Sequence, residues 1–166
     1  TPKPSSAASD VYKRQHQNVA IIMFDSILIV CTGNICRSPI GERVLRKLLP
    51  GRRIDSAGTS ALVNYPADAC AVEVASKHGL SLEGHSGRQF TAKLGREYEL
   101  ILVMEKEHLT KISSIAPELR GKTMLYGHWL NQRDIPDPYR KSNEAFESVY
   151  QLIEKSGRYW ADKLSD

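Results

Sequence analysis

Short apolar runs alternate along the chain with longer stretches in which apolar residues recur every three or four positions. The runs SILIVC and ELILVM are typical of strands that are buried on both faces of a sheet. Together with two weaker runs, they predict strands over residues 26–31, 53–59, 99–104 and 122–126. The helical spacing predicts helices over residues 38–49, 67–78, 105–115 and 143–164.

This alternation of strands and helices predicts an α/β fold, a single domain in which helices flank a four-stranded parallel sheet. We expect Ser38 to cap the first helix with Pro39 at its first position, and Gly79 to end the second helix. The chain has 166 residues, which is enough for one ordinary domain and too few for two.

The N-terminal segment differs from the rest of the chain. Residues 1–18 are polar and rich in Pro, Ser and Ala, so residues 1–22 are interpreted as a disordered or non-native extension. The domain is then expected to span residues 23–166, with Met23 as its start. Asp25 interrupts the only long apolar stretch, VAIIMF followed by SILIV, so we expect no membrane insertion.

The charge of the chain gives little support for a large anionic partner. The formal net charge is +4, from 23 basic and 19 acidic residues. Residues 1–22 contain Lys3, Lys13 and Arg14 against Asp10, so the remainder has 20 basic and 18 acidic residues. Because this balance is nearly neutral and no long Lys/Arg run occurs, we expect no nucleic-acid binding, whereas a local anion site remains compatible with the sequence.

Cysteine usage points to a reducing compartment. Cys31, Cys36 and Cys70 are too few, and odd in number, for the disulfide framework of a secreted protein. Their spacing matches no zinc motif, so we expect no metal site. Cys70 lies on an apolar helix face and is interpreted as a core residue. We therefore expect a cytoplasmic protein in which a thiol is free to react.

The segment Cys31-Thr-Gly-Asn-Ile-Cys-Arg-Ser38 connects the first predicted strand to the first predicted helix. A loop in this position can point its N–H groups inward and bind phosphate or another oxyanion, assisted by the partial positive charge of the helix N-terminus. Gly33 and Asn34 are residue types that tolerate the positive φ such a loop needs. The residues predicted to bind phosphate or support the loop are Thr32, Gly33, Asn34, Ile35, Cys36 and Ser38.

Two side chains of this loop can carry chemistry. Arg37 can hold two phosphate oxygens with its planar guanidinium, and Cys31 is expected at the bottom of the loop. The inward N–H groups, Arg37 and a hydrogen bond from Ser38 would favour the nucleophilic thiolate. The alternative is that Cys31 is only a buried core cysteine, but its combination with Gly-Asn, arginine and Ser-Pro argues against this. A Walker loop and a GxGxxG loop are both absent.

A nucleophile that accepts a phosphoryl group needs an acid for the leaving oxygen. We assign Asp137, within Asp134-Ile-Pro-Asp-Pro-Tyr139, because the flanking prolines stiffen the loop that would aim its carboxyl group. An Asp-Pro turn is the structural alternative, and Asp134 is the competing carboxylate. Tyr139 is expected to form a wall of the substrate pocket, with a core tyrosine as the alternative. Leu62 and Tyr65 follow the second strand and are candidates for the rim of the pocket.

The motif from Cys31 to Pro39, followed by Asp137-Pro-Tyr139, resembles the low-molecular-weight protein-tyrosine phosphatases. The segments DSAGT at 55–59 and PAD at 66–68 also fit, and the resemblance runs from about residue 24 to residue 164. The sequence is most similar to the bacterial subgroup that is associated with tyrosine autokinases of capsule and exopolysaccharide export. The resemblance implies a phosphotyrosine protein as partner, in particular a membrane tyrosine autokinase, and no metal or cofactor.

The resemblance also implies roles for individual residues. Cys31 is the nucleophile that becomes phosphocysteine, and Arg37 binds the phosphate and its transition state. Asp137 protonates the leaving phenolate and then activates water. Asn34 and Ser38 hold the loop and orient the thiolate.

Two further loop residues are notable. The resemblance implies that Cys36 can form a protective disulfide with Cys31 under oxidation. Thr32 departs from many animal members, which carry leucine there, and it affects the chemistry of the rim. His85 and Arg88 lie in a Gly/Ser-rich segment that is interpreted as a solvated loop, with an approach to the site as the alternative.

Two alternative functions are weighed against phosphotyrosine hydrolysis. A thiol-dependent arsenate reductase can share this fold and loop, but it would need a downstream cysteine pair, and only Cys70 lies beyond the loop. A non-catalytic phosphotyrosine-binding module could discard the nucleophile or the acid, and both are present. Phosphoserine is a poorer expectation, because a deep pocket with an aromatic wall suits the longer phosphotyrosine.

Overall fold

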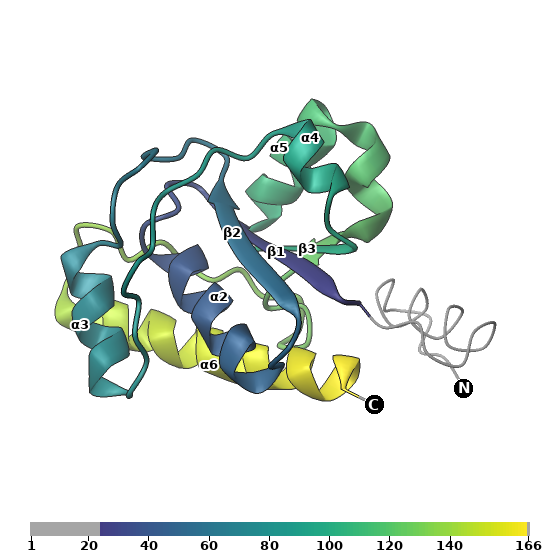
Figure 1. The fold of residues 1–166 in the computed structure, drawn as a ribbon. Coiled ribbons are helices and arrows are strands. Elements are labelled where there is room, and N and C mark those ends of the chain that lie inside the picture. Colours follow the sequence, from purple (N-terminus) through teal and green to yellow (C-terminus); the bar gives the residue numbers. More distant parts are fainter. Residues whose placement is uncertain (1–23, 166) are drawn as a thin grey trace.

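The computed structural model describes residues 24–165 (Figure 1). The predicted N-terminal extension and the expected start at Met23 lie outside these residues, and so does Asp166. None of the helices found between residues 24 and 165 is both long enough and apolar enough to cross a membrane.

The chain alternates strands and helices, as predicted. The strands are β1 (Ser26–Cys31), β2 (Arg53–Gly58), β3 (Leu100–Val103) and β4 (Thr123–Leu125). The helices are α2 (Arg37–Leu48), α3 (Ala69–Lys77), α4 (Ala92–Arg96), α5 (Lys106–Ile115), the 3-10 helix η1 (Pro117–Lys122) and α6 (Asn143–Leu164).

The four strands form one parallel sheet in the order β2-β1-β3-β4, which confirms the predicted fold class. In the register of this sheet, Cys31 of β1 lies opposite Gly58 of β2, and Val30 lies opposite Val103 of β3. The carboxyl ends of the central strands therefore meet at one edge. Loops that follow these strands can converge there on a common ligand.

Residues of β1 alternate between two hydrophobic clusters, because successive side chains of a strand point to opposite faces. Ile27 and Ile29 belong to a cluster that includes residues of α2, α3 and α6. Leu28 and Val30 belong to a second cluster, which includes residues of α5 and η1 on the other face. The sheet is thus covered on both sides, with α2, α3 and α6 on one side and α4 and α5 on the other (Figure 1).

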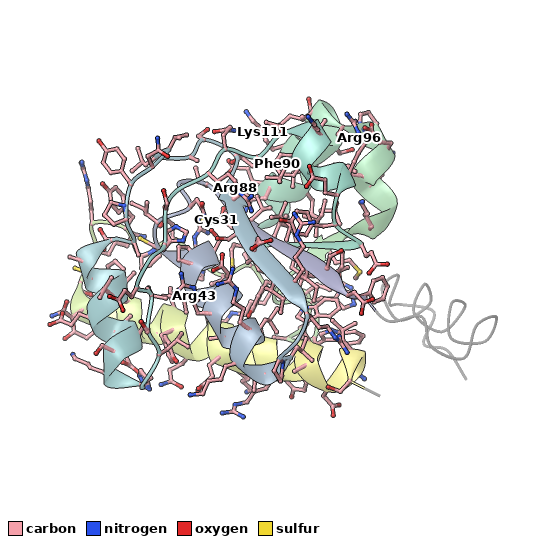
Figure 2. All side chains as sticks on the ribbon, in the orientation of Figure 1. Cys31, Arg43, Arg88, Phe90, Arg96 and Lys111 are labelled. Atoms are coloured by element: carbon pink, nitrogen blue, oxygen red, sulfur yellow. The ribbon has the colours of Figure 1, made fainter. Side chains whose placement is uncertain are left out.

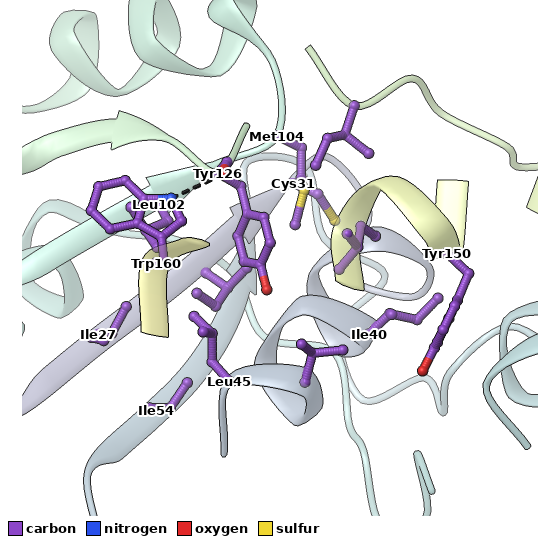
Figure 3. Close-up of a cluster of buried hydrophobic side chains, with 14 of the residues drawn as sticks. Ile27, Cys31, Ile40, Leu45, Ile54, Leu102, Met104, Tyr126, Tyr150 and Trp160 are labelled. Atoms are coloured by element: carbon purple, nitrogen blue, oxygen red, sulfur yellow. Dashed lines mark hydrogen bonds between the residues drawn. The ribbon is translucent and has the colours of Figure 1, made fainter. Parts of the chain in front are cut away.

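Packing of α6 on α2 fixes the position of α2, the helix that follows the predicted phosphate-binding loop. Trp160 is fully buried, and its indole N–H donates a 2.9 Å hydrogen bond to the carbonyl of Tyr126 (Figure 3). The Tyr126 hydroxyl in turn donates to the carbonyl of Gly41 in α2, at 3.1 Å. A Cβ at Gly41 would lie only 3.0 Å from the side chains of Met104 and Tyr126, so this position of α2 requires glycine for close packing.

Helix boundaries differ from the prediction in three places. The predicted cap at Ser38 is wrong, because α2 already begins at Arg37 and the Ser38 hydroxyl bonds to the loop instead. Helix α3 begins two residues later than predicted, after the cap Asp68, whose carboxylate accepts from the amides of Cys70 and Ala71. The short helix α4 was not predicted, because a single turn offers too few positions to show a period.

Candidate active site

The loop between β1 and α2 is closed by one residue in the left-handed conformation. Asn34 has a φ of 59° and is completely buried. Of the two residue types expected to tolerate a positive φ, only Asn34 adopts one, and Gly33 does not. Gly58 is needed instead, since a Cβ there would lie 2.4 Å from the carbonyl oxygen of Thr32. Because Gly58 has no side chain, the loop can pack directly on the end of β2.

Hydrogen bonds from the Asn34 side chain hold the loop. Its Nδ2 donates to the hydroxyl of Ser38 at 2.7 Å and to that of Ser56 at 3.0 Å. Its Oδ1 accepts from the backbone N–H of Arg88 at 2.8 Å. The carbonyl of Asn34 accepts from His85 Nε2 at 2.6 Å, which places the ring proton on that nitrogen.

These contacts correct the interpretation of His85 and Arg88 as part of a solvated loop. Both residues touch the loop through Asn34, although the Arg88 side chain is exposed. Figure 2 shows Arg88 and Cys31 at the same end of the sheet. Burial lowers the pKa of His85, which keeps its ring neutral.

The Cys31 sulfur accepts from one backbone N–H and lies within hydrogen-bond distance of one hydroxyl. The backbone N–H of Asn34 lies 3.3 Å from Sγ, and the Ser38 hydroxyl lies 2.9 Å from it. Because Ser38 accepts from Asn34, its own proton is free to point at the sulfur; the other acceptor, the carbonyl of Ala57, is more distant at 3.5 Å. Both groups are placed to donate to the sulfur when it acts as a nucleophile.

A buried carboxylate lies behind this network. Ser56 donates to Glu42 at 2.6 Å, and Glu42 is only 4% exposed. Its charge is compensated by Arg43, at 2.9 Å, and by Arg46, at 3.3 Å. The carboxylate that accepts from Ser56 is thus paired with two arginines, as a buried charge requires.

Arg37 is also buried and held from one side. Its Nη1 donates to the carboxylate of Glu105 at 2.5 Å and to the carbonyl of Ile135 at 2.8 Å. Its Nη2 lies 3.8 Å from Asp137 Oδ2. Among residues 24–165, neither Nε nor Nη2 of Arg37 has a hydrogen-bond acceptor. One edge of the guanidinium is therefore fixed, and the other remains available to an anion.

Arg37 and Cys31 face a cavity of about 210 Å³. Its lining residues are Cys31, Thr32, Gly33, Ile35, Cys36, Arg37, Ser60, Leu62, Asp137 and Tyr139. Leu62 and Tyr139 thus lie where the sequence places them. Tyr65 does not line the cavity, contrary to expectation, because its backbone turns toward Gly87 and its side chain is exposed.

The two candidate carboxylates are separated by the structure. Asp137 lines the cavity, and its carboxylate accepts from the N–H of Tyr139 at 3.0 Å. Asp134 instead accepts from the N–H of Lys106 at 3.0 Å, at the start of α5. Only Asp137 therefore faces the site.

The second loop cysteine differs from the first. Cys36 is buried, and desolvation together with the charge of Asp68 raises the pKa of its thiol. Cys31 and Cys36 are both free thiols. Their pairing under oxidation stays a prediction. Cys70 is partly buried and packs against the core, as expected.

Several residues of the site were missed by sequence reasoning. They are Glu42, Ser56, Ser60, Glu105, His108 and Ile135. The one available signal was position, since Glu105 follows β3 at the edge where the loop after β1 also lies.

Glu105, Glu107 and His108 have ligand atoms close enough for a metal ion. However, Glu105 already binds Arg37, and both ring nitrogens of His108 are engaged.

Residues 26–166 match the family described as low molecular weight phosphotyrosine protein phosphatase. The chain belongs to this family. It is 60% identical over 147 residues to the low molecular weight protein-tyrosine-phosphatase Etp of Escherichia coli K12, covering 89% of this chain and 99% of that one. The family resemblance predicted from the two motifs is thereby confirmed.

Solved structures of the family share the fold. The tyrosine phosphatase Wzb from Escherichia coli K30, in complex with sulphate, has a TM-score of 0.85 and 64% identity, covering 86% of this chain and 100% of that one. Vibrio vulnificus Wzb in complex with benzylphosphonate has a TM-score of 0.83 and 54% identity, covering 85% and 99%.

Proposed function

We propose that this protein is a protein-tyrosine phosphatase that works through a phosphocysteine intermediate. The observation that carries the proposal is the convergence, in one cavity, of the hydrogen-bonded Cys31 sulfur, the free edge of Arg37 and the Asp137 carboxyl group. A nucleophile, an oxyanion binder and an acid are the groups that phosphoryl transfer to a protein side chain requires.

The first chemical step transfers the phosphoryl group. The Cys31 thiolate attacks phosphorus, an S–P bond forms, and the bond from phosphorus to the tyrosine oxygen breaks. Protonated Asp137 gives its proton to the leaving oxygen, so the product leaves as a neutral phenol. Arg37 and the N–H groups of the loop bind the phosphoryl oxygens as their charge develops.

The second step hydrolyses the intermediate. The Asp137 carboxylate, now unprotonated, takes a proton from water while the water oxygen attacks phosphorus. The S–P bond breaks, inorganic phosphate forms, and Cys31 leaves as a thiolate that the N–H of Asn34 and the hydroxyl of Ser38 stabilise. Asp137 ends the cycle protonated, as it began.

The shape of the cavity supports phosphotyrosine as substrate. Cys31 is only 2% exposed, so a short phosphoserine would bring the peptide backbone against the rim before its phosphate reached the sulfur. Leu62 and Tyr139 offer apolar walls for an aromatic ring. The relative from Vibrio vulnificus is described in complex with benzylphosphonate, which combines an aromatic ring and a phosphonate.

The proposed partner is a phosphotyrosine protein, specifically a membrane tyrosine autokinase of exopolysaccharide export, and the proposed location is the cytoplasm. The basis for both is the resemblance to the bacterial subgroup. A direct test is to incubate the enzyme with an autophosphorylated autokinase cytoplasmic domain and to follow loss of phosphotyrosine by immunoblot. If phosphate remains on the kinase while a short phosphotyrosine peptide is hydrolysed, the partner is wrong and the activity stands.

The activity itself is tested by steady-state kinetics on matched phosphotyrosine and phosphoserine peptides, with arsenate reduction measured in parallel. We expect hydrolysis of the phosphotyrosine peptide, little turnover of phosphoserine and no arsenate-dependent thiol oxidation. Acid quenching during turnover, followed by mass spectrometry, should detect a phosphoryl group on Cys31. Arsenate reduction without phosphatase activity would support the reductase instead.

A further inference from the structure

The start of α5 meets the loop that contains Cys31. Glu105 and His108 form a reciprocal cap at this helix start: the Glu105 side chain accepts from the backbone N–H of His108, and the Glu105 N–H donates to His108 Nδ1 at 3.0 Å. His108 is 1% exposed. Its ring therefore has a fixed position between α5 and the loop.

The hydrogen bonds determine where the ring proton of His108 lies. Because Nδ1 accepts from Glu105, the proton of the neutral ring is on Nε2. Nε2 lies 2.9 Å from the hydroxyl oxygen of Thr32, so the histidine donates and the threonine accepts. Desolvation and the nearby charge of Arg37 lower the pKa of His108 to about 4, which keeps the ring neutral at ordinary pH.

The hydroxyl proton of Thr32 is left without an acceptor. In the described part of the chain, the only hydrogen bond of this hydroxyl is the one with His108. Thr32 also lines the cavity that contains Cys31 and Arg37. A hydroxyl that accepts from a fixed donor behind it directs its own proton away from that donor, here toward the space that the substrate would occupy.

We propose that Thr32 donates a hydrogen bond to a phosphoryl oxygen of the substrate and that His108 is the positioning residue that orients this hydroxyl. The inference rests on the proposed function, because it concerns the same cavity. It adds a substrate contact from a side chain, beyond those of Arg37 and the loop N–H groups.

The same helix start also holds Arg37. The carboxylate of Glu105 accepts from Arg37 Nη1, while its backbone N–H fixes His108. Glu105 thus holds Arg37 directly and orients Thr32 through His108. Such fixed donors stabilise developing charge because they need no reorganisation when the reaction occurs.

The test compares variants at both positions by kinetics with 4-nitrophenyl phosphate and by inhibition with orthovanadate, which mimics the five-coordinate phosphorus. Thr32→Val removes the hydroxyl at nearly constant shape and should lower kcat/KM and vanadate affinity, each by about 10-fold or more. Thr32→Ser keeps the hydroxyl and should stay within about 3-fold of wild type. Thr110→Val is the control. Thr110 lies on α5, the helix that contains His108, and its hydroxyl donates to the carbonyl of Lys106 in that helix.

Two His108 variants separate the cap from the contact with Thr32. In His108→Asn the amide oxygen can still accept from the Glu105 N–H, but the side chain is too short to reach Thr32. In His108→Gln the amide nitrogen can reach Thr32. We expect His108→Asn to lose activity as Thr32→Val does, His108→Gln to recover part of it, and the double variant Thr32→Val/His108→Asn to be no worse than Thr32→Val alone.

Unchanged kcat/KM and vanadate affinity in Thr32→Val would overturn the proposal, and so would fully additive losses in the double variant. Failure of the proposed function is distinguishable from this result. If the wild type does not hydrolyse phosphotyrosine, calorimetric binding of inorganic phosphate to the same variants still measures the Thr32 contact. A loss of phosphate affinity in Thr32→Val, absent in Thr110→Val, would then support it.

Discussion

The phosphate loop, residues 31–38, and the acid loop, residues 134–141, face the same cavity with opposite characters. In the phosphate loop, Asn34, Arg37 and Ser38 are buried and hydrogen-bonded. In the acid loop, the side chain of Asp137 is 49% exposed and accepts one hydrogen bond, from its own turn. The phosphate loop is fixed by the protein interior, whereas the acid loop is anchored at buried Ile135 and held at Asp137 by its own turn.

The difference fits the roles that we propose for the two loops. Donors that stabilise a dianion are effective only when they are already in place, and the phosphate loop is packed with its buried side chains hydrogen-bonded. In the proposed mechanism the acid must meet a bulky aromatic leaving group, protonate it and then admit water, and the exposure of Asp137 fits that role. The phosphate loop is therefore the rigid segment of the site, and the acid loop is the segment that exposes its functional side chain.

The largest effect is expected at the nucleophile. Cys31→Ser should fold and still bind phosphate, but it should lose nearly all turnover, because a serine hydroxyl in the same place is a far weaker nucleophile. Cys36→Ser is the matched control and should keep much of its activity, since Cys36 is a buried thiol whose pKa is raised. Single-turnover kinetics with 4-nitrophenyl phosphate and phosphate titration measure both. Substantial turnover in Cys31→Ser would remove the assigned role.

The next effect is expected in the acid loop. Asp137→Asn should slow hydrolysis by about 10²–10⁴-fold for phenols that are poor leaving groups, and by less for an activated phenol. Asp134→Asn is the control, because that carboxylate bonds to the start of α5. The measurement is kcat across a series of aryl phosphates. A larger, leaving-group-dependent defect in Asp134→Asn would show that the acid is misassigned.

Stability should separate the two loops as well. Asn34 and Arg140 both have left-handed backbones, with φ of 59° and 62°. Asn34→Gly keeps that conformation but removes three side-chain hydrogen bonds, so it should destabilise the fold by about 2–4 kcal/mol. Urea denaturation measures the change. A loss below about 1 kcal/mol would mean that the loop does not depend on this side chain.

The smallest effect is expected at Arg140, and with the opposite sign. Arg140 lies at the third position of the turn closed by the Lys141 N–H and the Pro138 carbonyl, where a positive φ favours glycine. Arg140→Gly should stabilise the fold by about 0.5 kcal/mol, after the greater entropy of the unfolded glycine chain is included. Arg140→Ala, which keeps the strain, should not stabilise it. Equal effects of Gly and Ala in urea denaturation would contradict this explanation.

Local chemistry made part of this site predictable from the sequence. Cys31, Asn34, Arg37 and Ser38 lie within one short loop between a buried strand and a helix, so their convergence depends only on that loop. Asp137 was identifiable because the prolines beside it mark a stiff turn. The order of the elements also determined the parallel α/β class, since the periodicity of each strand and helix is local.

Only the tertiary structure could show what holds these residues. Glu105 follows β3, His108 lies in the first turn of α5 and Ser56 lies in β2. Their signals in the sequence are those of ordinary polar residues. Tyr65 is close in sequence to Leu62, which lines the cavity. Its side chain nevertheless points away from the cavity, because its backbone turns toward Gly87. Periodicity determines which residues form strands, whereas the order of those strands in the sheet determines which distant side chains meet at their ends.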